Sequence, residues 1–149
     1  FSVTMEATHH GPLIGKPSLF IEIGSTILEW ENLKAGFVIA KTISNIIQNF
    51  KYNQYNEVAI AIGGPHYCPN FNKIQLKSNI AISHIISSYA LPADELMIQE
   101  ALSKTYEEDV EFILLDWKGL GNASARQQLI DVLEKMNLRF VKTSDIDKG

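Results

Sequence analysis

One unbroken apolar run, Glu57 to Ile62 (EVAIAI), constrains the fold of this chain most strongly. Such a run is typical of a strand covered on both faces, as in a parallel sheet. It leads directly into the segment Gly63 to Pro69 (GGPHYCP), which is too rich in glycine and proline to form a helix or a strand. The sequence therefore predicts an α/β fold in which this loop follows the carboxyl end of a buried strand.

Strand and helix patterns alternate along the rest of the chain. The expected strands are 1–8, 57–62, 79–86, 110–115 and 138–142, and the expected helices are 27–50, 93–104 and 124–136. A further short apolar run, Leu19 to Gly24, holds Glu22 in a strand-like pattern. Thr26 with Glu29 can form a capping box, and Ser124 can cap the last helix. The alternation predicts a single α/β domain over residues 1–149 with a mostly parallel sheet.

Composition excludes several classes of protein. The 149 residues, 46% of them apolar, suffice for one globular core. The net charge of −4 argues against a basic nucleic-acid coat, although a local cationic patch could still hold a phosphate. A single cysteine, Cys68, excludes an internal disulfide framework, and no apolar run approaches the roughly 20 residues that span a bilayer. We therefore expect a soluble, cytoplasmic, monomeric protein without a stable protein partner.

The first residues are Phe1-Ser2-Val3-Thr4-Met5, a strand-like pattern without an initiating methionine. A chain that opens inside a secondary-structure element is expected to be part of a longer protein.

Polar segments follow three of the expected strands at their carboxyl ends: Thr8 to Pro12, Gly63 to Pro69 and Asp116 to Gly119. In open parallel sheets, ligands bind beyond this edge. The three segments together predict where a functional site lies.

Histidines are the strongest candidates for chemistry there, because imidazole is the usual base near neutral pH. His9, His10 and His66 all lie in the polar segments and could serve one pocket, as bases or as metal ligands. His84, flanked by isoleucines, fits a buried core histidine equally well. Glu6, Glu22 and Cys68 could add metal donors, although the zinc-finger spacings are absent.

Other residues near the same edge fit substrate binding as well as ordinary structural roles. Gly63 and Gly64 could expose amides to a phosphate or an oxyanion, or simply form a tight turn. Tyr67 could stack on a nucleobase or pack. Lys118 is placed to hold a phosphate, with Arg126 in the first turn of the next helix, or it is a solvated lysine. Glu22 could pair with a substrate ammonium or face solvent.

Two of these segments, Met5 to Pro12 (MEATHHGP) and Gly63 to Pro69, resemble the signature segments of the archaeal and plant type of D-aminoacyl-tRNA deacylase. Phe20 to Thr26 with Glu29-Trp30, and Asp116 to Leu120 with Arg126, are similar to that family too. The resemblance extends from the first residues to about Arg126. One departure is Ser83 to Tyr89 (SHIISSY), which stands where the family has a segment resembling Gly-His-Ile-Leu-Pro-Lys-Tyr, so that Ser88 replaces a lysine.

The resemblance implies hydrolysis of the ester between a D-amino acid and tRNA, zinc dependence, and a three-layer fold of the phosphorylase and peptidyl-tRNA hydrolase kind. It also implies that the chain is the C-terminal part of a longer protein. His9, His10 or His66 would activate water directly or through zinc, with Glu6 or His84 as further ligands. The substrate-binding residues would be Glu22, Gly63, Gly64, Tyr67 and Lys118. Two alternatives are a peptidyl-tRNA hydrolase-like esterase and a non-catalytic module that binds the tRNA end or a nucleotide.

Overall fold

The structure is a computed structural model that describes residues 2–9, 14–16, 18–50, 55–106 and 108–146. Contacts divide the chain into two compact units. Unit 1 comprises Phe1–Lys16 and Tyr55–Gly149, and unit 2 comprises Pro17–Gln54. Whether these units together form one domain, as the sequence predicts, stays a prediction. Among the described residues, no helix combines the length and apolar character needed to cross a membrane.

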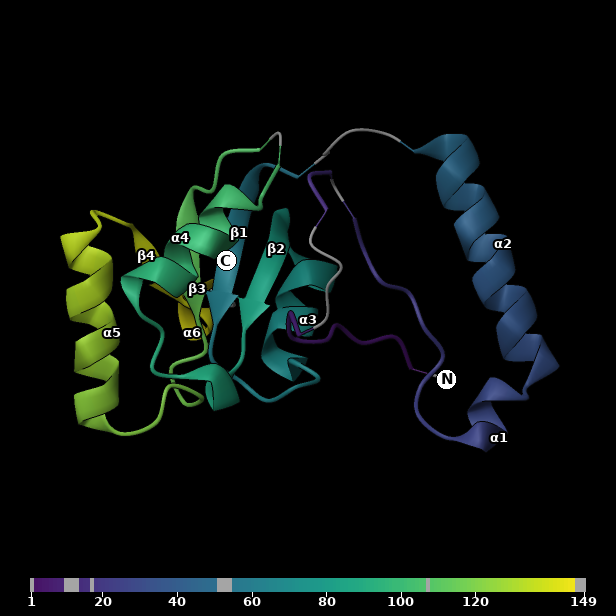
Figure 1. Cartoon of the computed structure of the whole chain (residues 1–149), viewed down its shortest axis with the longest axis horizontal. Helices are drawn as coiled ribbons and strands as arrows, with labels where there is room; N and C mark the ends of the chain where they lie inside the picture. The colour runs from purple at the N-terminus through teal and green to yellow at the C-terminus, as the bar shows by residue number, and fades with distance from the viewer. Residues whose placement is uncertain (1, 10–13, 17, 51–54, 107, 147–149) are drawn as a thin grey trace. The chain divides into compact units, whose positions relative to one another are not determined.

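Unit 1 alternates strands and helices around one sheet. Its elements are β1 (Glu57–Ile62), α3 (Pro69–Lys77), β2 (Ile80–Ile86), a 3-10 turn (Ser88–Ala90), α4 (Glu95–Ser103), β3 (Phe112–Leu115), α5 (Ala123–Lys135), β4 (Phe140–Lys142) and α6 (Thr143–Ile146). The four strands lie in the order β2-β1-β3-β4, and every neighbouring pair is parallel (Figure 1). The predicted α/β class and parallel sheet are confirmed.

The central strand β1 is buried on both faces because its side chains alternate between two apolar clusters. Ile60 and Ile62 belong to a cluster with residues of α4 and α5, whereas Ala59 and Ala61 pack in a second cluster with α3. All four side chains are fully buried. This double burial is the reason that the strand reads as an unbroken apolar run in the sequence.

Helices cover both faces of the sheet and so form three layers. On one face, Leu129 and Leu133 lie one turn apart on α5 and pack in the same cluster as Ile98 of α4. On the other face, Phe71 and Ile74 of α3 are buried against the sheet. The layers leave the carboxyl edge of the strands to the loops, and this is where the candidate site lies.

The strand predicted at residues 1–8 is wrong: the described residues 2–8 form no regular strand. The amide of Thr8 donates to the carbonyl of Ile85 (2.9 Å), and the amide of Ile85 donates to Thr8 Oγ1 (3.0 Å). Because a side chain accepts the second bond, the segment lies beside β2 without continuing its backbone ladder.

Several predicted helix boundaries are also corrected. Asn122 caps α5 in place of the predicted Ser124, with its side chain accepting from the amide of Ala125 (3.0 Å). Asp94 caps α4, which therefore begins two residues later than predicted. The sequence reasoning missed α3, whose first residue is Pro69, and the short α6. Pro69 was placed in a loop, although proline is favoured at the first position of a helix.

Unit 2 contains α1 (Ile27–Trp30) and α2 (Leu33–Asn49) in place of the single helix predicted over 27–50. The break falls at Asn32, whose side chain accepts from the amide of Ala35 (3.0 Å) and starts a new helix. The predicted contact of Thr26 with Glu29 is present, as the Thr26 amide donates to the Glu29 carboxylate (3.1 Å). The described residues 18–24 form no strand.

Candidate functional site

Three polar segments, one beginning at Thr8 and two following β1 and β3, meet at the carboxyl edge of the sheet in unit 1. The segment after β1 contacts the segment after β3, since a Cβ on Gly119 would lie only 2.2 Å from the nitrogen of Gly64. Asn70, at the start of α3, also donates through Nδ2 to Asp116 Oδ2 (2.9 Å). Thr8 joins the same edge through Ile85, next to the end of β2. The expectation that these segments share one edge is confirmed, whereas His10 to Pro12 lie outside the described residues.

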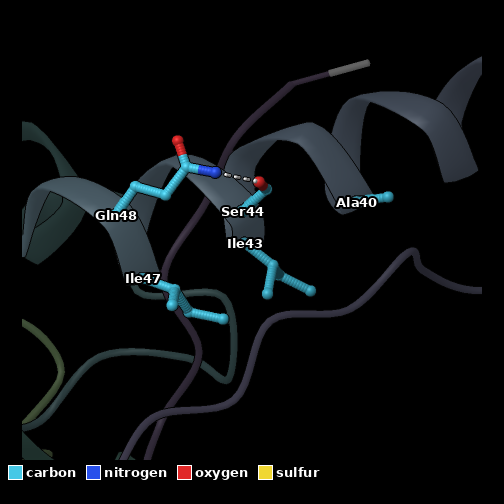
Figure 2. A pocket seen from close by; sticks show the side chains of 5 residues that line it. All are labelled: Ala40, Ile43, Ser44, Ile47 and Gln48. Atoms are coloured by element: carbon cyan, nitrogen blue, oxygen red, sulfur yellow. Dashed lines mark hydrogen bonds between the residues drawn. The ribbon is translucent and has the colours of Figure 1, made fainter.

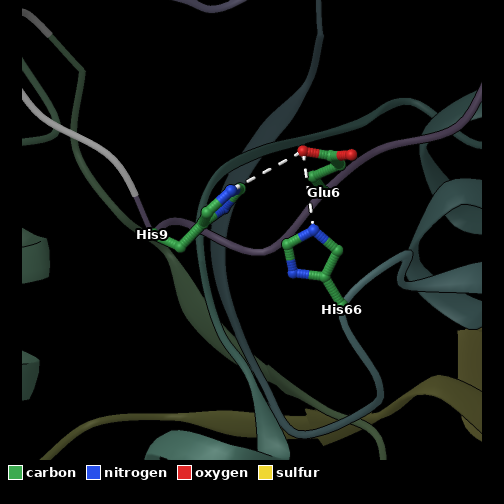
Figure 3. Close-up of side chains that lie close together, drawn as sticks. All are labelled: Glu6, His9 and His66. Atoms are coloured by element: carbon green, nitrogen blue, oxygen red, sulfur yellow. Dashed lines mark ion pairs between the residues drawn. The ribbon is translucent and has the colours of Figure 1, made fainter. Parts of the chain in front are cut away.

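Glu6, His9 and His66 lie close together at this edge (Figure 3). Glu6 Oε2 is 3.8 Å from His9 Nε2 and 3.7 Å from His66 Nε2, and the two imidazole ring centroids are 4.5 Å apart. The three potential ligand atoms all lie within 4.8 Å of one another. Residues sixty positions apart in the sequence thus converge on one small volume.

Backbone hydrogen bonds position this cluster. The amide of Ala7 donates to the carbonyl of His66 (2.8 Å), and Thr4 Oγ1 donates to the carbonyl of Tyr67 (2.9 Å). Ala7 itself is only 2% exposed, so it anchors the extended segment in the core while Glu6 remains partly exposed. The N-terminal segment is therefore held against the loop after β1 on both sides of Glu6.

The hydrogen bond of His9 determines which ring nitrogen carries its proton. Nδ1 of His9 lies at hydrogen-bond distance from the carbonyl of Ala7, and a carbonyl can only accept. In the neutral imidazole the lone pair is then on Nε2, the atom that faces Glu6. His66 also directs Nε2 toward Glu6, while its Nδ1 lies 3.4 Å from the hydroxyl of Tyr89. Metal-binding histidines show this same arrangement, with the second ring nitrogen bonded to an oxygen.

Two imidazole nitrogens and one carboxylate oxygen form a donor set that suits zinc. The three side chains are between 26% and 36% exposed, so water can reach the cluster. Three protein ligands with an open fourth position are typical of catalytic zinc sites, whereas structural zinc sites are closed by four. Among the described residues this is the group of donors that could hold a metal ion.

Cys68 does not join this donor set. It is 1% exposed, and its Sγ lies 3.1 Å from the carbonyl of His66, to which the thiol donates. Burial and the nearby carboxylates of Glu6 and Asp116 raise the pKa of the Cys68 thiol to about 11. Because only the thiolate is a good nucleophile or metal ligand, this side chain stays inert near neutral pH.

The glycines at this edge permit two loops to pack backbone against backbone. Gly63 and Gly64 have positive φ angles of 102° and 76°. A Cβ on Gly119 would lie 2.2 Å from the nitrogen of Gly64, and a Cβ on Gly63 would lie 3.0 Å from the carbonyl oxygen of Asp116. The amide of Gly63 also donates to the carbonyl of Ile86 (2.8 Å). This packing explains the glycines without a ligand, and their role with an oxyanion stays a prediction.

The structure places the remaining predicted site residues as follows. Tyr67 is exposed and meets the His66 ring edge-on at 4.9 Å between centroids. Lys118 is exposed in the turn after β3. His84 is half-buried on β2 and lies outside the Glu6–His9–His66 cluster, and Glu22 belongs to unit 2.

Sequence reasoning did not assign roles to two residues that touch this site. Tyr89 places its hydroxyl beside His66 and its ring 6.3 Å from the imidazole, and Asp116 is buried, 5% exposed, beside Gly64. Both follow the carboxyl ends of strands, β2 and β3. The rule that directed attention to the histidine loop would have found them as well.

A shallow pocket on α2 offers no comparable chemistry (Figure 2). It is lined by Ala40, Ile43, Ser44, Ile47 and Gln48, all from one helix. The lining contains no carboxylate, imidazole or thiol. The candidate site is therefore the cluster at the sheet edge.

Comparison with known proteins agrees with these features. Residues 1–141 match the model of the family described as D-aminoacyl-tRNA deacylase. The chain is 44% identical over 143 residues to a D-aminoacyl-tRNA deacylase of Pyrococcus furiosus. The aligned region covers 95% of this chain and 51% of that protein. It is 34% identical over 148 residues to a protein of that name from Methanosarcina mazei, covering 98% of this chain and 47% of the relative.

A solved structure, described as the conserved protein of unknown function AF0625, superposes with a TM-score of 0.81 at 30% identity. The match covers 98% of this chain and 50% of that one. The chain thus spans about half the length of the relatives that it matches. Because the family model matches residues 1–141, nearly the whole chain, the chain belongs to the D-aminoacyl-tRNA deacylase family.

Proposed function

We propose that this chain hydrolyses the ester bond of D-aminoacyl-tRNA and releases the free D-amino acid and tRNA. The observation that carries the proposal is the convergence of Glu6, His9 and His66 at the carboxyl edge of a parallel sheet. An imidazole pair beside a carboxylate can activate water at neutral pH. Family membership supplies the substrate class, an aminoacyl-tRNA.

We further propose that zinc binds to Glu6 Oε2, His9 Nε2 and His66 Nε2, and that His10, which lies outside the described part of the chain, is a fourth candidate ligand. When bound, zinc would lower the pKa of a coordinated water and polarise the ester carbonyl. The backbone carbonyl of Ala7 would keep His9 in the tautomer that offers Nε2, and the hydroxyl of Tyr89 would orient the ring of His66.

The chemistry balances with one water and no further reactant. The oxygen of water attacks the ester carbonyl carbon, and its proton goes to an imidazole Nε2 of the metal-free cluster, or to solvent when zinc would hold both Nε2 atoms. The bond between that carbon and the ribose oxygen then breaks, and the leaving oxygen takes up a proton from the same source. An ester is already an activated acyl group, so an oriented water and one base suffice, and no protein nucleophile is required.

The test uses the whole chain with D-tyrosyl-tRNA and L-tyrosyl-tRNA, with and without added zinc. We expect zinc-dependent loss of the D-ester only. The variants Glu6→Gln and His66→Ala should lower the rate by at least about 100-fold, the scale of a general base. His84→Ala removes a histidine outside the cluster and is the matched comparison. Equal loss of both esters, or a His66→Ala variant with full rate, would contradict the proposal.

A further inference from the structure

Trp117, Arg126 and Lys142 form a second group at the same sheet edge, which we call the tryptophan cluster. The Cζ atom of Arg126 lies 5.3 Å from the centroid of the indole, and Nζ of Lys142 lies 4.0 Å from it. Trp117 follows the end of β3, Lys142 is the last residue of β4, and Arg126 lies in the first turn of α5. Because Leu115 of β3 pairs with Lys142, the two strands bring these residues to one level of the sheet.

The positive charges of this cluster are not balanced by carboxylates. None of the ion pairs formed among the described residues includes Arg126, Lys142 or the exposed Lys118. The Nε of Arg126 is moreover buried without a hydrogen-bond partner in the described part of the chain. A buried donor without an acceptor is rare in folded proteins, so the guanidinium of Arg126 keeps the capacity to donate a hydrogen bond to water or to a ligand.

Arg139 is another cation that lies over an aromatic ring, but this arginine also has a carboxylate partner. Its Cζ lies 5.3 Å from the ring centroid of Phe112, the same distance as in the tryptophan cluster. Its guanidinium, however, lies 3.6 Å from the carboxylate of Glu57. Arg139 precedes β4 and Glu57 begins β1, so this pair marks the amino edge of the sheet. Arg139 at the amino edge thus has a carboxylate partner, whereas no ion pair among the described residues includes Arg126 or Lys142 at the functional edge.

We propose that the tryptophan cluster binds a backbone phosphate of the unpaired RNA chain that leads to the aminoacylated terminal nucleotide. This inference rests on the proposed function. A guanidinium and an ammonium beside the same indole can each donate to the oxygens of a phosphodiester. The net charge of the chain is −4, so its affinity for RNA depends on such a local group of cations.

The spacing of the two clusters fits a chain of a few nucleotides. The Glu6–His9–His66 cluster lies beside the ends of β1 and β2, and the tryptophan cluster lies beside the ends of β3 and β4. Neighbouring strands are about 4.8 Å apart, so two strand spacings, roughly 10 Å, separate the clusters along the edge of the sheet. Trp117 packs on the α4 and α5 side and Ala7, next to Glu6, on the α3 side, so the full separation is larger. An ester at the first cluster therefore leaves a nearby upstream phosphate within reach of the second.

The experiment measures binding of a fluorescently labelled, non-acylated RNA oligonucleotide that ends in CCA to the whole chain, by anisotropy over a series of salt concentrations. Arg126→Gln and Lys142→Gln should each weaken binding about tenfold at low salt. Each should also reduce the slope of log affinity against log salt by about 0.7, the value for one phosphate contact on a single strand. Arg139→Gln is the matched control and should change neither quantity.

Equal binding by the wild type, Arg126→Gln and Lys142→Gln would overturn the proposal, and so would an equal loss in Arg139→Gln. Lys142 is at the end of a strand, so its variant keeps the test decisive if Arg126→Gln does not fold, which circular dichroism reports. Failure of the proposed function is a separate result: the wild type would then bind the oligonucleotide through this cluster yet leave D-aminoacyl-tRNA intact.

Discussion

Among the described glycines, Gly119 is the one at which an added Cβ meets the closest obstacle. A Cβ built on it lies 2.2 Å from the nitrogen of Gly64 and 2.8 Å from its Cα, well inside the contact distance of any real Cβ. Both obstacles are backbone atoms, which cannot rotate away as a side chain can. In Gly119→Ala the loop after β3 must therefore separate from the loop that holds His66.

The expected loss in the free energy of unfolding is about 3 kcal/mol, at the upper end of the range for overpacking. For a chain of this size this corresponds to roughly 6–12 °C in Tm. Urea unfolding followed by circular dichroism measures the loss. Because the displaced loop includes His66, zinc affinity should fall in the same variant.

Gly36→Ala provides the matched control, because it is the same substitution with the opposite expected sign. Gly36 lies inside α2, and a Cβ there meets nothing within 4 Å. Alanine should stabilise this helix by about 0.5–1 kcal/mol. If Gly119→Ala proved as stable as the wild type, the close packing of the two loops would be refuted.

Three further predictions follow from individual side chains. The pKa of the Cys68 thiol is raised, so the stability that the neutral thiol contributes should be complete below pH 9 and be lost as the pH rises toward about 11. Iodoacetamide at pH 8 should label Cys68 only after unfolding. Rapid labelling of the folded chain would contradict this. Tyr89→Phe removes the hydroxyl beside His66 Nδ1 and should weaken zinc binding about tenfold in a chelator competition, and an unchanged affinity would show that the hydroxyl does not orient the ring. Asn32→Ala removes the cap of α2 and should cost about 1 kcal/mol in urea unfolding, whereas no loss would mean that the helix does not depend on this cap.

The sequence predicts the elements whose determinants are local. The run Glu57 to Ile62 is buried on both faces by helices that follow it, and its continuous apolar composition predicts this double burial. The helix over 27–50 is wrong in one detail, since a single side-chain hydrogen bond from Asn32 is enough to start a new helix. Asn122 shows the same limit, because several polar residues before a helix can serve as its cap.

Residues brought together by long-range contacts are less accessible to sequence reasoning. Phe1 to Thr8 has the alternation of a strand, yet Ile85 pairs with a threonine hydroxyl there and no ladder forms. Tyr89 meets His66 only because β1 and β2 are neighbours in the sheet. The histidines were nevertheless predictable as a group, because the ends of parallel strands lie at one edge whatever the details of packing.

The most direct test of the account is X-ray absorption at the zinc edge on the zinc-loaded chain. The proposed site predicts scattering from two imidazole nitrogens, or three if His10 also binds, and a carboxylate oxygen at about 2.0–2.2 Å, with no sulfur at about 2.3 Å. His66→Ala should remove one imidazole contribution from the spectrum, and His84→Ala should leave the spectrum unchanged. A sulfur ligand from Cys68, or an unchanged spectrum in His66→Ala, would show that Glu6, His9 and His66 do not hold the metal.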